Sequence, residues 1–75
     1  KLVVKTSGSS ITLRTEPRVD KSTFIIYMHF GTELLVLEGN EAANKIGQKD
    51  QWLHVQTVSG RKGYVAAWFV QKVSQ

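Results

Sequence analysis

Short stretches in which apolar and polar residues alternate recur along the chain, and turn-forming residues separate them. In residues 11–14 the apolar Ile11 and Leu13 alternate with polar residues, and this period of two is typical of a strand with one buried face. Residues 52–57 alternate in the same way. Further strands are predicted where apolar residues cluster, at residues 24–30, 33–38, 64–65 and 69–73. Several short strands separated by turn signals predict a small all-β barrel or sandwich.

The most apolar stretch, residues 24–30, is predicted to be a strand rather than a helix. It is rich in β-branched and aromatic residues and ends at Gly31, and so short a segment would make only about two turns of isolated helix, which is marginal. Three polar or unpatterned segments are predicted to be connections between strands. They are a surface loop at residues 15–22, a long loop at 39–50 and a hairpin turn at 58–63.

The alternation also predicts which side chains face the core. The predicted inward set takes one or two apolar side chains from each strand: Leu13, Leu34, Val36, Leu53, Val55 and Val65. Because successive side chains of a strand point to opposite faces, Trp52, His54 and Gln56 are predicted to face away from that core. Trp68 lies in the closing turn before the last strand, where we also expect partial exposure.

Length and composition limit the chain to one domain. Its 75 residues carry a net charge of +4, and 41% are hydrophobic and 21% charged, which is typical of a folded domain rather than a disordered or membrane-inserted segment. The basic excess favours anionic partners, but only Arg61 and Lys62 are adjacent cations, so it does not select among nucleic acid, lipid headgroups and wall polymers. Cysteine is absent, which excludes disulfides and thiolate chemistry.

The start of the chain is weakly patterned. Residues 1–10 include a stretch of small polar residues, and we predict an N-terminal extension or linker there, with the single domain spanning residues 11–75. Residues 1–5 lack the length and cleavage pattern of a signal peptide, and no apolar run approaches the roughly 18 residues of a membrane helix. We therefore expect no membrane insertion and a domain that belongs to a longer protein.

No group of residues has the spacing of a catalytic or metal site. His29 and His54 have no second ligand at metal-binding spacing, and the six acidic residues are dispersed, so neither a metal site nor a paired-carboxylate site is indicated. Residues 60–63 contain two glycines but are predicted to form a hairpin turn rather than a phosphate-binding loop, because no helix follows them. We predict no enzymatic activity, no metal and no cofactor.

Aromatic side chains are the strongest candidates for ligand binding. A solvent-facing tryptophan such as Trp52 or Trp68 offers apolar area and one N–H donor, a combination favoured at binding hot spots and sugar-stacking surfaces. Four more residues complete the predicted ligand-binding set, two for their rings, one for its outward imidazole and one as a cation for an anionic partner: Tyr27, Tyr64, His54 and Arg18.

Four motifs in order resemble the bacterial Src-homology-3-like (SH3-like) domain family. They are Ile-Thr-Leu-Arg-Thr-Glu-Pro at residues 11–17, Gly-Thr-Glu-Leu-Leu-Val-Leu at 31–37, Trp-Leu-His-Val at 52–55, and Gly-Arg-Lys-Gly-Tyr-Val-Ala-Ala-Trp-Phe at 60–69. The resemblance spans about residues 11–70, and the loop at 39–50 is longer than the family usually has. It implies an SH3-like barrel of about five short antiparallel strands, with Phe69 in the core.

The resemblance also implies a function. Such domains are add-on modules of secreted peptidoglycan hydrolases and envelope proteins, so we expect an extracytoplasmic, non-catalytic binding or targeting module whose ligand is a cell-wall peptide or glycan. Proline-rich peptides are not expected, because Ala66 and Phe69 replace the proline and tyrosine that the eukaryotic relatives use. An aromatic shelf of Trp52 and Trp68 would hold the ligand, and the loops at 15–22 and 39–50 would supply polar contacts.

Two other functions stay open. In the first, the domain is structural and packs on a neighbouring catalytic domain of the parent protein, with the same tryptophans in the interface. In the second, a basic β-barrel binds nucleic acid through exposed rings. We rank that hypothesis last, because the sequence has no basic stripe interleaved with aromatic residues.

Overall fold

A computed structural model describes residues 2–73 of the chain. Short antiparallel strands account for most of the regular structure, and the only helical segments among these residues are 3-10 turns. The strands are β1 (Val3–Thr6), β2 (Ile11–Arg14), β3 (Phe24–Met28), β4 (Glu33–Val36), β5 (Trp52–Thr57), β6 (Lys62–Ala66) and β7 (Val70–Lys72). The 3-10 turns are η1 (Lys21–Thr23), η2 (Asn40–Lys45) and η3 (Ala67–Phe69).

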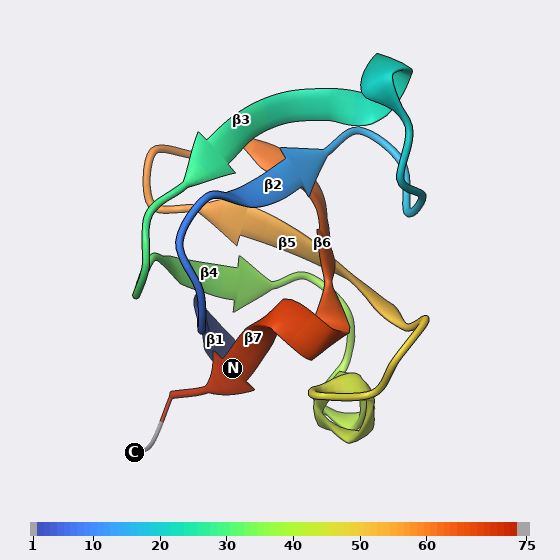
Figure 1. Cartoon of the computed structure of the whole chain (residues 1–75). Helices are drawn as coiled ribbons and strands as arrows, with labels where there is room; N and C mark the ends of the chain where they lie inside the picture. The colour runs from blue at the N-terminus through green and yellow to red at the C-terminus, as the bar shows by residue number, and fades with distance from the viewer. Residues whose placement is uncertain (1, 74–75) are drawn as a thin grey trace.

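All seven strands belong to one antiparallel sheet, in the order β3-β2-β6-β5-β4-β1-β7. The sheet is bent, as Figure 1 shows, with the β2–β3 hairpin at one end and β1 and β7 at the other. Strands β3 and β7 are its edges and do not pair with each other, so hydrogen bonds do not close the sheet into a barrel. The predicted small antiparallel β-domain is confirmed at this level, with more strands than the five expected from the sequence.

The N-terminal residues differ from the prediction. Residues 1–10 were expected to be an extension or linker, but Val3–Thr6 form β1, which lies inside the sheet between β4 and β7. Val4 is fully buried. Thr6 is buried too, and its hydroxyl donates to the carbonyl oxygen of His29 at 2.7 Å. A threonine on the inward face hides the alternation that would otherwise mark this strand.

The core lies within the bend of the sheet and combines side chains from both of its ends. Leu13 of β2 and Val4 of β1 belong to one apolar cluster, although their strands are far apart in the strand order. The six residues predicted to face inward are all buried: Leu13, Leu34, Val36, Leu53, Val55 and Val65. The strand register read from alternation is therefore confirmed for β2, β4, β5 and β6.

Phe69 does not belong to this core. Its side chain is 44% exposed, whereas Ala67 and Val70 on either side of it are buried. The prediction that Phe69 is buried was wrong, because η3 has the tight geometry of a 3-10 turn, in which side chains repeat every three residues rather than every two. Its inward positions are thus Ala67 and Val70, and Phe69 packs on the Trp68 ring instead, with centroids 5.5 Å apart.

Candidate ligand-binding groove

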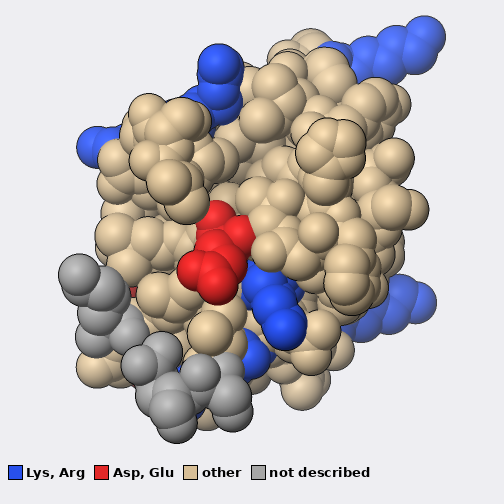
Figure 2. Space-filling view, turned by 90° about the vertical axis from the view of Figure 1, so that its left-hand side faces the viewer, with Lys and Arg blue, Asp and Glu red and all other residues tan. Residues whose placement is uncertain are grey.

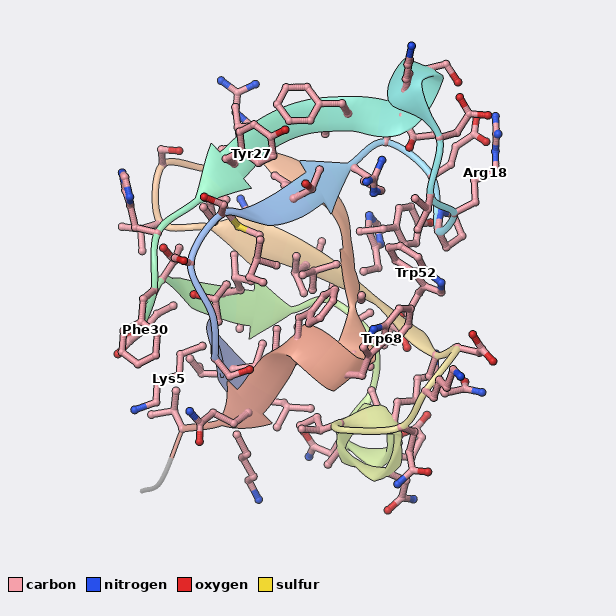
Figure 3. The ribbon with its side chains drawn as sticks, viewed as in Figure 1. Lys5, Arg18, Tyr27, Phe30, Trp52 and Trp68 are labelled. Atoms are coloured by element: carbon pink, nitrogen blue, oxygen red, sulfur yellow. The ribbon has the colours of Figure 1, made fainter. Side chains whose placement is uncertain are left out.

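Trp52 and Trp68 lie against each other on one side of the molecule (Figure 3). Trp52 is the first residue of β5 and faces away from the core, while Trp68 projects from η3. Their ring centroids are 5.5 Å apart and the ring planes meet at 81°, an edge-to-face pair. Both side chains are half-buried. Each indole therefore supports the other and still presents surface to solvent.

Hydrogen bonds from the long loop and the residue after it hold this pair in place. The N–H of Ala67 donates to the carbonyl oxygen of Gln51 at 2.9 Å, which ties η3 to the residue before Trp52. The N–H of Gly47 donates to the carbonyl oxygen of Ala67 at 2.8 Å. Lys45 Nζ donates to the carbonyl oxygen of Trp52 at 3.2 Å. The 39–50 segment, which was expected to contact the ligand, thus helps to position the two tryptophans.

A cavity of about 460 Å³ opens beside the tryptophan pair. One wall is aromatic, formed by Trp52, Trp68 and Phe69, and Val19 from the β2–β3 loop adds an apolar side chain. Hydroxyl-bearing residues of the β1–β2 loop and of β2 also line the cavity: Ser7, Ser9, Ser10 and Thr12. Arg14 is the one charged residue among those that line this cavity.

A second cavity, of about 570 Å³, adjoins the first. Thr12, Arg14 and Val19 line both, and we call the two together the groove. The far part of the groove is lined by Lys21 and Asp20 and by two rings of β3, Phe24 and Tyr27. Those rings also meet edge to face, with centroids 4.8 Å apart. The groove thus has an aromatic pair at each end and Arg14 in its middle.

The register of the strands explains why these side chains share one surface. Tyr27 is opposite Thr12, and Phe24 is opposite Arg14, so all four project from the same face of the β2–β3 hairpin. The register shifts between Leu13 and Arg14, where the ladder is bulged. Such a bulge bends the hairpin locally.

The six predicted ligand-binding residues divide into two groups. Trp52, Trp68 and Tyr27 line the groove, the first two at one end and Tyr27 at the other. Tyr64 and His54 do not. They form a cross-strand pair whose rings stack 4.6 Å apart with planes at 18°. Both are half-buried, and their rings pack against each other.

Arg18 also lies outside the groove lining, and its charge is already paired. Its Nε donates to Glu16 at 2.8 Å and its Nη1 to Asp20 at 2.7 Å, and these hydrogen bonds raise the pKa of the guanidinium. The Asp20 carboxylate accepts from the backbone N–H and hydroxyl of Ser22 and from Arg18, which lowers the pKa of Asp20. Arg18 thus serves to shape its own loop (Figure 3).

Arg14 and Val19 line the groove but are not among the six ligand-binding residues predicted from the sequence. Alternation in β2 does turn Arg14 away from the core, and this was the available signal. The loop at residues 15–22 was expected to contact the ligand, and Val19, Asp20 and Lys21 of this loop do line the groove. The 39–50 loop was expected to contact the ligand, but none of its residues lines the groove.

Other chemistry is sparse in the described residues. Between residues 2 and 73, no three His, Asp or Glu side chains gather closely enough to hold a metal ion. None of the helical segments in that part of the chain has the length and apolar character to cross a membrane. Comparisons with protein-family models, with curated proteins and with solved structures find no match. The chemistry of the groove must therefore indicate the ligand.

Proposed function

We propose that this chain is a non-catalytic, SH3-like binding module of a bacterial extracytoplasmic protein, and that its groove holds a cell-wall peptide or glycan. The observation that carries the proposal is the half-buried Trp52–Trp68 pair beside a cavity that is also lined by four hydroxyl-bearing residues. Aromatic faces take flat or apolar parts of a ligand, and hydroxyls exchange hydrogen bonds with its polar edges. Sugars and short peptides offer both kinds of group.

The order of the strands supports the SH3-like arrangement. A long polar loop joins β2 to β3, a hairpin joins β5 to β6, and a tight 3-10 turn precedes the last strand. The four motifs that resemble the bacterial family fall on β2, β4, β5 and the β6–η3 segment. The proposed wall ligand and the extracytoplasmic location rest on that resemblance.

The test is a calorimetric titration of the purified chain with soluble peptidoglycan fragments. Trp52→Ala and Trp68→Ala should each weaken binding about tenfold or more, because each removes a ring that both contacts the ligand and supports its neighbour. Phe30→Ala is the matched control. Phe30 is 68% exposed and lies on the opposite side from the tryptophans, so its removal should leave affinity unchanged. Equal affinity of all four proteins would contradict the proposal.

A structural role is the second candidate, and one observation favours it. Four large apolar side chains that line the groove are exposed: Val19, Phe24, Tyr27 and Phe69. Contiguous exposed apolar surface is typical of protein interfaces. If the groove packs on a neighbouring catalytic domain, the tryptophan variants should weaken the association of the two domains and leave fragment binding undetectable in every variant.

Nucleic-acid binding remains the third candidate. Figure 2 shows one face on which basic side chains stand apart around an acidic one, rather than in a continuous stripe. Binding of oligonucleotides with a steep dependence on salt would favour this function over the other two.

A further inference from the structure

Arg14 lies where the two cavities of the groove meet and lines both of them. Among residues 2–73, it is the only charged residue that lines the cavity beside the tryptophans. No carboxylate between residues 2 and 73 lies within ion-pair distance of its guanidinium, although Arg18, close by in sequence, is paired with two. Arg14 thus brings an unpaired positive charge to the mainly apolar and hydroxyl-lined cavity beside the tryptophans.

The guanidinium of Arg14 is anchored at one nitrogen. Its Nη1 donates to the carbonyl oxygen of Asp20 at 2.9 Å and to Oγ1 of Thr23 at 3.0 Å. Both acceptors therefore lie on the same side of Nη1. Thr23 is buried, and its hydroxyl lies 2.7 Å from the Asp20 carbonyl oxygen and 3.0 Å from that of Arg18. The β2–β3 loop thereby fixes the orientation of Arg14.

The opposite edge of the same guanidinium has donors to spare. Nε and Nη2 make no hydrogen bond to any residue in the described part of the chain. These two groups form a planar fork whose spacing matches the two oxygens of a carboxylate. A donor pair held rigid before the ligand arrives loses little freedom on binding, which favours affinity.

We propose that Arg14 is the anchor for an oxyanion of the ligand, and specifically for a carboxylate, bound side-on by Nε and Nη2 between the Trp52–Trp68 and Phe24–Tyr27 pairs. This inference rests on the proposed function and adds the ligand's chemical class: a flat or apolar part next to a single carboxylate. Phosphate has the same oxyanion chemistry but carries more charge, and only Arg14 is charged in the lining of the cavity beside the tryptophans. Across the whole groove, Arg14, Lys21 and Asp20 sum to one positive charge, which matches one monoanion.

The test compares two probes that differ in a single group. Muramyl dipeptide carries one carboxylate, and its amide derivative is neutral. The wild-type chain should bind the free acid about tenfold more tightly than the amide, which is the scale of one charge-assisted hydrogen-bonded pair. Arg14→Gln should remove that preference and leave the affinity for the amide nearly unchanged. Arg14→Lys should retain part of the preference, because the charge remains and the fork is lost.

Arg61→Gln is the matched control. It removes the same unit of charge from a residue that lines neither cavity, so the preference for the acid should persist. Backbone amide spectra of each variant show whether it is folded. Equal binding of acid and amide by the wild type would overturn the carboxylate anchor while leaving the proposed function intact, and binding of neither probe would overturn both. Displacement of the acid by glycerol 3-phosphate more strongly than by acetate would overturn the carboxylate in favour of phosphate.

Discussion

Gly63 of β6 packs directly against the backbone of Arg14. A Cβ atom on Gly63 would lie 2.7 Å from the carbonyl oxygen of Arg14, and it would also lie 2.9 Å from Cγ of the fully buried Leu13. One obstacle is backbone and the other is a core side chain, so neither can move aside at low cost. Strand β6 therefore reaches β2 because residue 63 has no side chain, and the same contact sets the backbone that carries Arg14 into the groove.

Gly63→Ala is expected to lower the free energy of unfolding by about 1–3 kcal/mol, the usual cost of forcing an extra methyl group into a packed interior. Chemical denaturation measures the change. Gly8→Ala is the control, because its Cβ would meet only Cδ1 of Ile11 at 3.4 Å, an ordinary contact. If the two variants lose the same stability, the close approach of β6 to β2 does not limit the fold.

The strands that alternation marks clearly could be predicted with their register, and the others could not. Leu53 and Val55 face inward and Trp52 faces outward as expected, because β5 has one buried face and one solvent-facing face. Strand β1 was missed because Thr6 is buried and satisfied by a distant carbonyl. No local pattern can indicate a partner 23 residues away in the chain.

The groove could be predicted only in part, for a similar physical reason. The outward turn of Trp52 follows from alternation, and the exposure of Trp68 follows from its place in a turn. The anchoring of Arg14 depends on Thr23 and on the path of the β2–β3 loop, and the exposure of Phe69 depends on the 3-10 geometry of η3. The first is a tertiary property and the second is a change of local geometry, and a period of two encodes neither.

Glu38 joins the long loop to β5 through a charged network. Its Oε1 lies 2.8 Å from Lys45 Nζ, and its Oε2 accepts from the His54 backbone N–H at 2.9 Å. Partial burial raises the pKa of Glu38, but the hydrogen bonds from Lys45 and His54 and the charge of Lys45 together lower it below its ordinary value. A depressed folded-state pKa means that ionised Glu38 stabilises the fold above the unfolded-state pKa, and that this contribution is lost as the pH falls through the folded-state pKa.

Glu38→Gln should therefore lower the free energy of unfolding at neutral pH, by about 0.5–1 kcal/mol because both partners are partly exposed and screened by solvent. The difference from wild type should shrink toward zero as the pH falls below the depressed pKa. Urea unfolding at a series of pH values measures this. Glu41→Gln, in the same loop and outside the described ion pairs, should show no such trend. A Glu38→Gln deficit that is constant with pH would mean that the carboxylate charge is not what ties the loop.

Thr23 is a positioning residue for Arg14. Variants that lack or retain its hydroxyl separate an effect on stability from an effect on ligand preference. Thr23→Val keeps the shape of the buried side chain but removes the acceptor for Arg14 Nη1 and the donor to the loop carbonyls. We expect it to lower the free energy of unfolding by about 1–3 kcal/mol, because buried polar groups lose their partner. It should also reduce the preference for muramyl dipeptide over its amide, since Arg14 is then free to turn.

Thr23→Ser restores the hydroxyl and should restore the preference, although loss of the methyl group still costs some stability, on the order of 1 kcal/mol. The stability and the acid-over-amide ratio are measured on the same samples by denaturation and calorimetry. A purely structural Thr23 would give a Val variant that is less stable but keeps the full ratio. In that case Arg14 would be held well enough by the Asp20 carbonyl alone, and the rigid fork would not depend on the buried threonine.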